Sequence, residues 1–287
     1  MADGPQGVRN KTRSTFYPCG ISLASTWNPD LAREMGRGLA LDARARGIGI
    51  MLGPGVNIYR SALCGRNFEY YGEDPVLASA IACGYIEGMQ QNGVIATIKH
   101  FAANNQEHRR MSSSSNADER TLREIYFPAF ETSVKKAQPW TVMCSYNRIN
   151  GVYASENPWL LTDVLRGEWG FDGLVVSDWG AAYDQAKAIA AGNDLDMPGP
   201  RDIQPILDAV ANGSLKMEEI DLAVSRMLQM LLDMPVMKGR KYDKIDPDYS
   251  KDVAYRCAEE GITLLKNDGL LPVSYTHLRA HETSQDL

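Results

Sequence analysis

Polar side chains follow several apolar stretches of this sequence at the point where each stretch ends. Asp178 and Trp179 follow one apolar run, Lys99 and His100 end another, and Tyr146 follows a third. Such positions place reactive groups on rigid supports, so together they predict a polar pocket at one end of a sheet. The positions of this kind are Arg66, Asn67, Glu69, Lys99, His100, Met143 to Asn147, Asp178 and Trp179.

A pocket with a carboxylate, several cations, a tyrosine and a tryptophan suits a sugar. Charged groups hydrogen-bond the hydroxyls, and an aromatic wall packs against the apolar face of the ring. Retaining glycosidases need a carboxylate nucleophile and a second carboxyl group about 5–5.5 Å away. Asp178 is the candidate nucleophile, because cations such as Lys99 would keep it ionised.

Other interpretations of these residues stay open at this point. Asp178 could cap the helix that follows its strand. Lys99 and His100 could form a surface salt bridge and a hydrogen-bonded core histidine. A lyase or aldolase would use Lys99 as a Schiff base. A barrel that binds sugar without turning it over would need the same pocket.

Strand-like and helix-like segments alternate along most of the chain, and this order predicts an α/β fold with a parallel sheet. A (β/α)8 TIM-like barrel is favoured over a doubly wound sheet, because GPGVN at 53–57 matches neither a P-loop nor a dinucleotide fingerprint. The expected strands are 20–27, 47–58, 93–101, 139–147 and 173–179. The expected helices are 28–47, 74–93, 118–137 with a bend near Pro128, 157–170, 182–191 and two more through about 234, with a short apolar segment at 193–198.

Composition excludes some classes of partner. The 287 residues are 44% hydrophobic and 23% charged, with a net charge of −6. This balance, without a basic face, predicts no nucleic-acid partner. No apolar stretch approaches the roughly 18 residues of a membrane helix, so no membrane partner is expected.

The five cysteines are scattered and odd in number, which indicates reduced thiols and slightly favours a cytoplasmic location. The first ten residues lack the apolar core of a signal peptide. The compartment is otherwise unknown from the sequence, and a homo-oligomer is possible. His277 and His281 have helical spacing but no further ligands nearby, so no metal site is expected.

Four segments together resemble one known family. DGPQGVR (3–9), GRNFEYYGEDP (65–75), IKHF (98–101) and the stretch 144–180 are similar to the catalytic barrel of family 3 glycoside hydrolases, with the β-glucosidase branch nearest. The resemblance covers roughly residues 3 to 273. The N-acetylhexosaminidase branch is disfavoured, because AANNQEH follows Lys99-His100-Phe101 where that branch usually has Pro-Gly-His-Gly.

The resemblance implies a role for each matching residue and no metal or organic cofactor. Asp178 would be the nucleophile that forms a covalent glycosyl-enzyme. Tyr146 would lie beside it, while Met143 and Trp179 would shape the walls, although Met143 could equally belong to the core. The residues implied to hold the hydroxyls of the terminal sugar are Asp3, Arg66, Lys99 and His100.

Three further groups near the expected pocket have less certain roles. Glu69 could touch sugar, but it could also organise Arg66 or Lys99. His108, Arg109 and Arg110 precede a serine run that is typical of a loop at the pocket rim. Asp118 and Glu119 are most simply a helix N-terminus, where the helix dipole favours acidic residues.

The family pattern also predicts the domain organisation. Residues 1–234 would be the glycoside hydrolase barrel, lacking its first strand. Residues 235–273 would be a linker and the start of a following α/β sandwich domain, and 274–287 a non-native tail. In this family the acid/base glutamate comes from the later domain, outside this sequence. We therefore expect a β-glucosidase-like retaining hydrolase acting on a β-glucoside or oligosaccharide, or else an inactive or merely sugar-binding barrel fragment.

Overall fold

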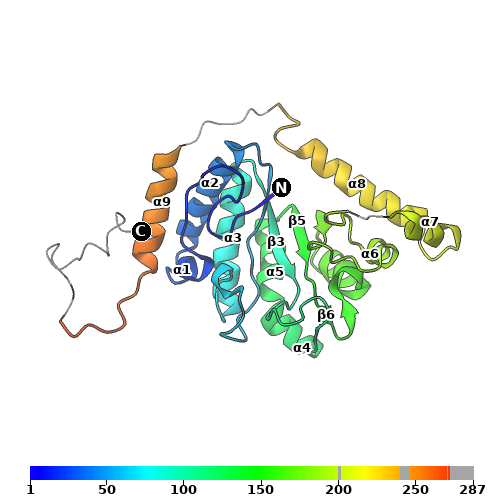
Figure 1. Ribbon diagram of the computed structural model, residues 1–287, viewed down its shortest axis with the longest axis horizontal. Coiled ribbons are helices and arrows are strands. Elements are labelled where there is room, and N and C mark those ends of the chain that lie inside the picture. Colours follow the sequence, from blue (N-terminus) through cyan, green and yellow to red (C-terminus); the bar gives the residue numbers. More distant parts are fainter. Residues whose placement is uncertain (200–201, 240–245, 270, 272–287) are drawn as a thin grey trace.

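A parallel sheet forms the centre of the protein (Figure 1). The computed structural model describes residues 1–199, 202–239, 246–269 and 271. The strands lie in the order β1-β2-β3-β5-β8, each parallel to its neighbours, and a bridge from Val176 to Leu195 extends the sheet by one more position. The bounds are β1 Ala2–Asp3, β2 Ile50–Leu52, β3 Ile95–Phe101, β5 Thr141–Cys144 and β8 Leu174–Val176.

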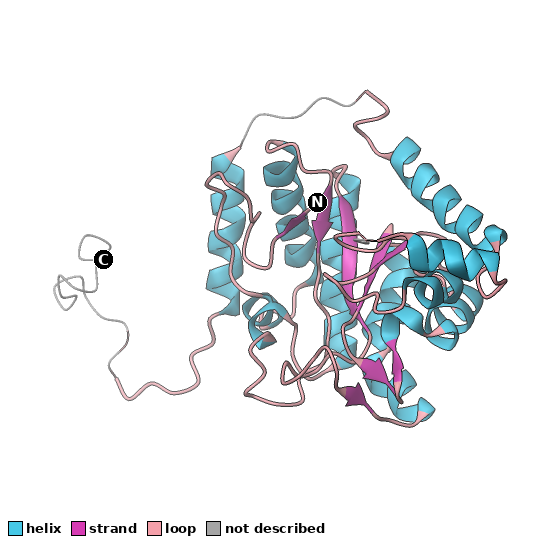
Figure 2. Ribbon diagram, turned by 45° about the vertical axis from the view of Figure 1, so that its right-hand side comes forward, coloured by secondary structure: helices cyan, strands magenta, loops and turns pink. Residues whose placement is uncertain are grey.

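The predicted α/β class is confirmed, since helices follow the strands and pack around them (Figure 2). This arrangement of parallel strands and covering helices is that of a TIM-like α/β fold. The sequence predicted no strand ahead of Asp3. In the structure, Ala2 and Asp3 form a short edge strand opposite Met51 and Leu52.

The helices begin where the sequence placed their start signals. Asn28 accepts hydrogen bonds from two backbone amides at the start of α2, and Asp74 does the same for α3. Pro128 opens α5, which places the expected break in the segment 118–137. The helical bounds are α2 Pro29–Arg44, α3 Pro75–Gln91, α4 Glu119–Thr121, η2 Leu122–Tyr126, α5 Pro128–Thr132, η3 Ser133–Ala137, η5 Trp159–Glu168, α6 Gln185–Ala191, α7 Gln204–Ala211 and α8 Met217–Asp233.

The predicted strand at 20–27 is wrong. This segment contains the short helix α1, Gly20–Ala24, whose buried residues are Gly20, Leu23 and Ala24. Their spacing is helical, and a short apolar run does not distinguish a strand from a buried helix. The helix also needs Gly20, because a Cβ there would lie 2.5 Å from the backbone oxygen of Glu69.

Two apolar clusters lie on the two sides of the sheet. The larger one includes Phe101, Phe127, Phe130 and Trp169, whose ring centroids are 5.0–5.7 Å apart where they pair. The smaller one joins side chains of β2, β3, β5 and β8 to Met230 of α8. Met143 belongs to this smaller cluster, so it has a core position, and its role as a wall of the pocket remains a prediction.

Three short strands form a second sheet: β4 (Ser114–Ser115), β6 (Arg148–Ile149) and β7 (Val152–Tyr153). The last described helix, α9 (Pro247–Gly261), packs against α1 and α2, on the opposite side of the molecule from α7 and α8 (Figure 1). The division at residues 234 and 273 remains a prediction, and the expected tail at 274–287 lies outside the described residues. Within the described ranges, no helix is long and apolar enough to cross a membrane.

Candidate active site

The eight residues to which the family resemblance gives a role line one cavity of about 350 Å³ at the carboxyl ends of the strands. This volume lies within the range of small-molecule sites. The eight residues are Asp3, Arg66, Lys99, His100, Met143, Tyr146, Asp178 and Trp179. Glu69 and Arg110, whose roles the sequence left open, also line it, as do Arg9 and Phe68, which the sequence did not single out. The expected strand-end residues that are not among the lining residues are Asn67, Cys144, Ser145 and Asn147.

The Asp178 carboxylate lies at the end of β8, and within the described residues only one of its two oxygens accepts a hydrogen bond. Its Oδ1 accepts a hydrogen bond from the backbone amide of Trp179 at 2.7 Å. Its Oδ2 is buried without a hydrogen-bond partner in the described part of the chain, and lies 3.6 Å from His100 Nε2. Asp178 does not cap the next helix, because Asp184 caps α6. Within the described residues, the second carboxylate oxygen is therefore not committed to a hydrogen bond.

His100 is almost completely buried and is held by two residues that the sequence did not single out. Asn57 accepts from the His100 backbone amide and donates to its carbonyl, both at 2.9 Å. Tyr70 Oη lies 3.2 Å from the ring nitrogen Nδ1. Burial lowers the pKa of His100 well below its usual value, and the nearby positive charges of Arg66, Lys99 and Arg110 lower it further. The imidazole is therefore neutral near pH 7.

Two cations, the buried Lys99 and the partly buried Arg66, are oriented by carboxylates. Lys99 Nζ lies 3.1 Å from Asp3 Oδ1 and 3.9 Å from Glu69 Oε2, and Arg66 Nε lies 2.5 Å from Glu69 Oε1. Glu69 thus organises both cations, which is one of the two roles expected for it. Lys99 is buried, so it is not part of a surface salt bridge. A Schiff base needs an uncharged amine, whereas two carboxylates surround this ammonium group.

Tyr146 and Trp179 form the wall near the cavity mouth. Tyr146 Oη donates to the carbonyl oxygen of Trp179 at 3.0 Å. Burial, followed by the negative charge of Asp178, raises the pKa of Tyr146 to about 12, so its hydroxyl stays protonated. The Trp179 side chain remains 53% exposed, which leaves an aromatic face for a ligand at the entrance.

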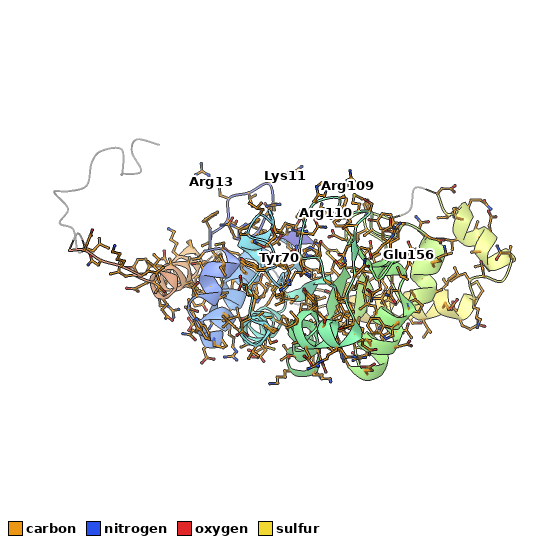
Figure 3. All side chains as sticks on the ribbon, turned by 90° about the horizontal axis from the view of Figure 1, so that it is seen from below. Lys11, Arg13, Tyr70, Arg109, Arg110 and Glu156 are labelled. Carbon is orange, nitrogen blue, oxygen red and sulfur yellow. The ribbon has the colours of Figure 1, made fainter. Side chains whose placement is uncertain are left out.

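Cations gather around this entrance. The Arg110 guanidinium lies 4.3 Å from the centroid of the Tyr146 ring and pairs with Glu107 at 2.7 Å. Figure 3 shows Lys11 and Arg13 along the same edge of the molecule as Arg109 and Arg110. The rim position expected for Arg110 is therefore found, since this residue lines the cavity.

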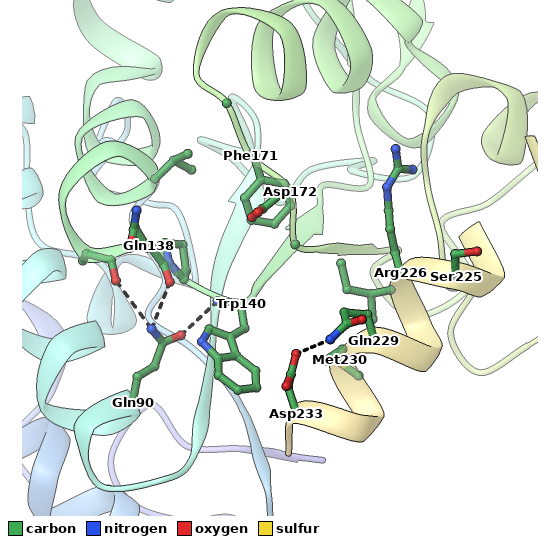
Figure 4. Close-up of a pocket in the computed structure, with 16 residues that line it drawn as sticks. Gln90, Gln138, Trp140, Phe171, Asp172, Ser225, Arg226, Gln229, Met230 and Asp233 are labelled. Carbon is green, nitrogen blue, oxygen red and sulfur yellow. Dashed lines mark hydrogen bonds between the residues drawn. The ribbon is translucent and has the colours of Figure 1, made fainter. Parts of the chain in front are cut away.

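A second cavity, of about 640 Å³, lies between α8 and the amino-terminal ends of β5 and β8 (Figure 4). Several of its polar side chains already form hydrogen bonds within the protein. Gln229 donates to Asp233 at 2.6 Å, and Gln90 bonds the backbone around Gln138 and Trp140. None of the eight predicted residues lines it. Among the described residues, no group of three His, Cys, Asp or Glu side chains could hold a metal ion.

The fold and the cavity define an α/β-barrel protein whose site lies at the carboxyl ends of its strands. Residues 1–230 match the family described as "Glycosyl hydrolase family 3 N terminal domain". The chain belongs to glycosyl hydrolase family 3.

Similar proteins include sugar hydrolases from several bacteria. The chain is 46% identical over 288 residues to thermostable beta-glucosidase B of Acetivibrio thermocellus, a match that covers 95% of this chain and 38% of that protein. It is 44% identical over 288 residues to an exo-alpha-(1->6)-L-arabinopyranosidase of Bifidobacterium longum, covering 96% and 38%. The solved structure of beta-glucosidase 3B from Thermotoga neapolitana in complex with alpha-D-glucose superposes with a TM-score of 0.91 at 45% identity, covering 95% of this chain and 41% of that one. This chain thus spans less than half the length of these relatives.

Proposed function

We propose that this chain provides the sugar-binding barrel and the nucleophile of a retaining β-glycosidase. The observation that carries the proposal is the Asp178 carboxylate, which lines a cavity together with cations and aromatic rings and whose buried Oδ2 has no hydrogen-bond partner among the described residues. Retaining glycosidases use such a carboxylate to form a covalent sugar intermediate.

The first step would form a bond from Asp178 Oδ2 to C1 of the terminal sugar. The bond from C1 to the leaving group breaks, and the leaving oxygen takes a proton. In the second step water attacks C1, the ester bond breaks, and the Asp178 carboxylate is regenerated. Lys99 and Arg66 would bind hydroxyls with their charged donors, and Trp179 would pack against the sugar or its leaving group.

The proton for the leaving group needs a carboxylic acid. The described carboxyl groups that line the cavity are Asp3, Glu69 and Asp178. Asp3 is ion-paired to Lys99 and Glu69 to Arg66, so both carboxyl groups are already engaged by cations. We therefore assign the acid/base role to a group outside these lining residues.

The proposed substrate is a terminal β-glucoside, either alone or at the end of an oligosaccharide. Two of the three similar proteins above are named beta-glucosidases, and this supports glucose as the terminal sugar. An open depression of about 1120 Å³ continues past Trp179 between α6 and α7. This depression would receive the remainder of a longer chain. The runner-up function, sugar binding without hydrolysis, is favoured by the pairing of both other carboxylates in the cavity.

A mechanism-based inactivator tests the nucleophile. A 2-deoxy-2-fluoro-β-glucoside of dinitrophenol carries a leaving group that departs without a proton, so it needs no acid from the protein. We expect the intact mass of the chain to rise by one fluoroglucosyl group, with the label on the peptide that contains Asp178. Asp178→Asn should abolish labelling, while Asp184→Asn, which makes the same change at the N-cap of α6 and keeps a capping oxygen, should not. A label on any other residue, or its absence in a chain that binds glucose, would refute the assignment.

A further inference from the structure

The imidazole of His100 is surrounded at Nδ1 and faces the cavity at Nε2. Nδ1 lies 3.2 Å from Tyr70 Oη and 3.3 Å from Asn57 Oδ1, and Nε2 lies 3.6 Å from Asp178 Oδ2. A neutral imidazole carries a single proton. The nitrogen that holds it decides whether the cavity meets a hydrogen-bond donor or an acceptor.

Asn57 alone would favour a proton on Nδ1. A backbone amide only donates and a carbonyl only accepts, so the two bonds to the His100 backbone fix which way the Asn57 amide points. The atom near Nδ1 is therefore an oxygen. This oxygen is uncharged and already accepts a hydrogen bond from the His100 backbone amide, so it is a weak acceptor for a second N–H group.

Tyr70 and Asp178 favour the opposite tautomer. The Tyr70 hydroxyl is buried, and within the described residues its one hydrogen-bond contact is His100 Nδ1. With the proton on Nε2, Tyr70 donates to Nδ1 and an N–H faces the Asp178 carboxylate. With the proton on Nδ1, the hydroxyl hydrogen loses its acceptor, and a lone pair faces a full negative charge. Buried groups left unpaired in this way are costly, and interactions with charged groups are the stronger ones.

We infer that Tyr70 is a positioning residue that fixes His100 as the Nε2–H tautomer, so that His100 presents a donor beside Asp178. The charged and titratable groups around the ring are Asp178, Tyr70, Arg66, Lys99 and Arg110. Burial, with the three cations, keeps the ring neutral, so a single proton remains to be placed. Under the proposed function, this N–H would donate to a sugar oxygen; the tautomer itself does not depend on that function.

Nitrogen NMR of the whole chain measures the tautomer directly. The chain contains four histidines, so a sample labelled with [¹⁵N]histidine gives a small set of imidazole signals. The variant His100→Gln identifies the signals of His100. We expect a protonated, pyrrole-type Nε2 and an unprotonated, pyridine-type Nδ1 at neutral pH. The reverse pattern in the unaltered chain would overturn the inference.

Two matched variants test Tyr70 itself. Tyr70→Phe removes the donor to Nδ1, so both nitrogen shifts should move toward an average of the two tautomers, with the Nδ1–H population raised several-fold. Tyr71→Phe removes a neighbouring buried hydroxyl that has no contact with His100, and should leave the spectrum unchanged. A Tyr70→Phe spectrum identical to that of the unaltered chain would show that Tyr70 does not set the tautomer. If NMR shows the Nε2–H form but the fluoroglucoside never labels Asp178, this inference stands and the proposed function is refuted.

Discussion

The side chain of His100 is buried, lies near several charged groups and has close contacts to hydrogen-bonding partners. It lies at the end of β3, and it is contacted by Asn57 and Tyr70 from the segment between β2 and α3 and by Asp178 from the end of β8. Its burial and the nearby Arg66, Lys99 and Arg110 all disfavour the charged ring. The folded protein therefore resists protonation at this position, whereas the unfolded chain does not.

This difference predicts a pH dependence of stability. An unfolded histidine takes up a proton near pH 6.5, whereas folded His100 takes it up only at lower pH. Below about pH 6.5 the unfolded state thus binds more protons, and the free energy of unfolding falls by up to about 1.4 kcal/mol per pH unit. Urea unfolding of the chain between about pH 7.5 and 5 measures this slope.

Two histidine variants separate His100 from other titrating groups. His100→Gln should remove most of the slope below about pH 6.5, whatever its effect on stability at pH 7. His108→Gln replaces an exposed histidine and should keep the slope. Equal slopes in His100→Gln and the unaltered chain would contradict the argument.

At the scale of elements, a buried carboxylate joins β8 to two helices. Asp194 is fully buried and accepts from Arg166 of η5 at 2.6 Å, from Arg226 of α8 at 2.9 Å and from the Val175 amide at 2.7 Å. Arg166 also donates to the carbonyl oxygens of Gly173 and Gly192. These contacts fix β8, and therefore the direction in which Asp178 leaves it.

Removing one partner of this group should be costly. Arg166→Met leaves the buried Asp194 carboxylate with Arg226 as its remaining cation, and we expect a loss of about 3 kcal/mol, near the lower end for broken buried pairs. Arg123→Met breaks an exposed pair with Glu168 and should cost about 1 kcal/mol or less. Urea unfolding compares the two variants. Similar losses in both would mean that the buried group does not hold the elements together.

At the scale of the whole molecule, residues at strand ends were the most predictable part of the site. Asp178, Lys99 and His100 each follow an apolar run, and parallel strands bring such ends to one edge. Arg66 was expected in the loop after its strand, Asp3 was placed through the family resemblance, and both line the same cavity. The positions of these side chains therefore follow from local pattern and topology.

The supporting residues could not be predicted in the same way. Asn57 and Tyr70 lie in the long segment between β2 and α3, whose path depends on packing against β3. A loop of this length carries no periodic pattern that reports which side chain meets His100. The error at α1 has a related cause, because its helix is stabilised by contacts with α9 and η1 (Asn67–Glu69) that are distant in sequence.

The arrangement of charges over the whole cavity predicts how this chain should treat different substrates. The cavity offers a free nucleophile but no unpaired carboxylic acid among its described residues, so bond cleavage should depend strongly on the leaving group. General acid catalysis typically contributes about 10²–10⁴-fold, and an acidic phenol does not need it. We compare the rate of dinitrophenol release from its β-glucoside with the rate of methanol release from methyl β-glucoside. We expect the ratio of these two rates to be at least about 100-fold larger for this chain than for a chain with the acid in place.

Release of each alcohol is measured with the unaltered chain and with Asp178→Asn, which controls for contaminating glycosidases. Rapid Asp178-dependent hydrolysis of methyl β-glucoside would show that the described cavity already contains the acid, and would return that role to Asp3 or Glu69.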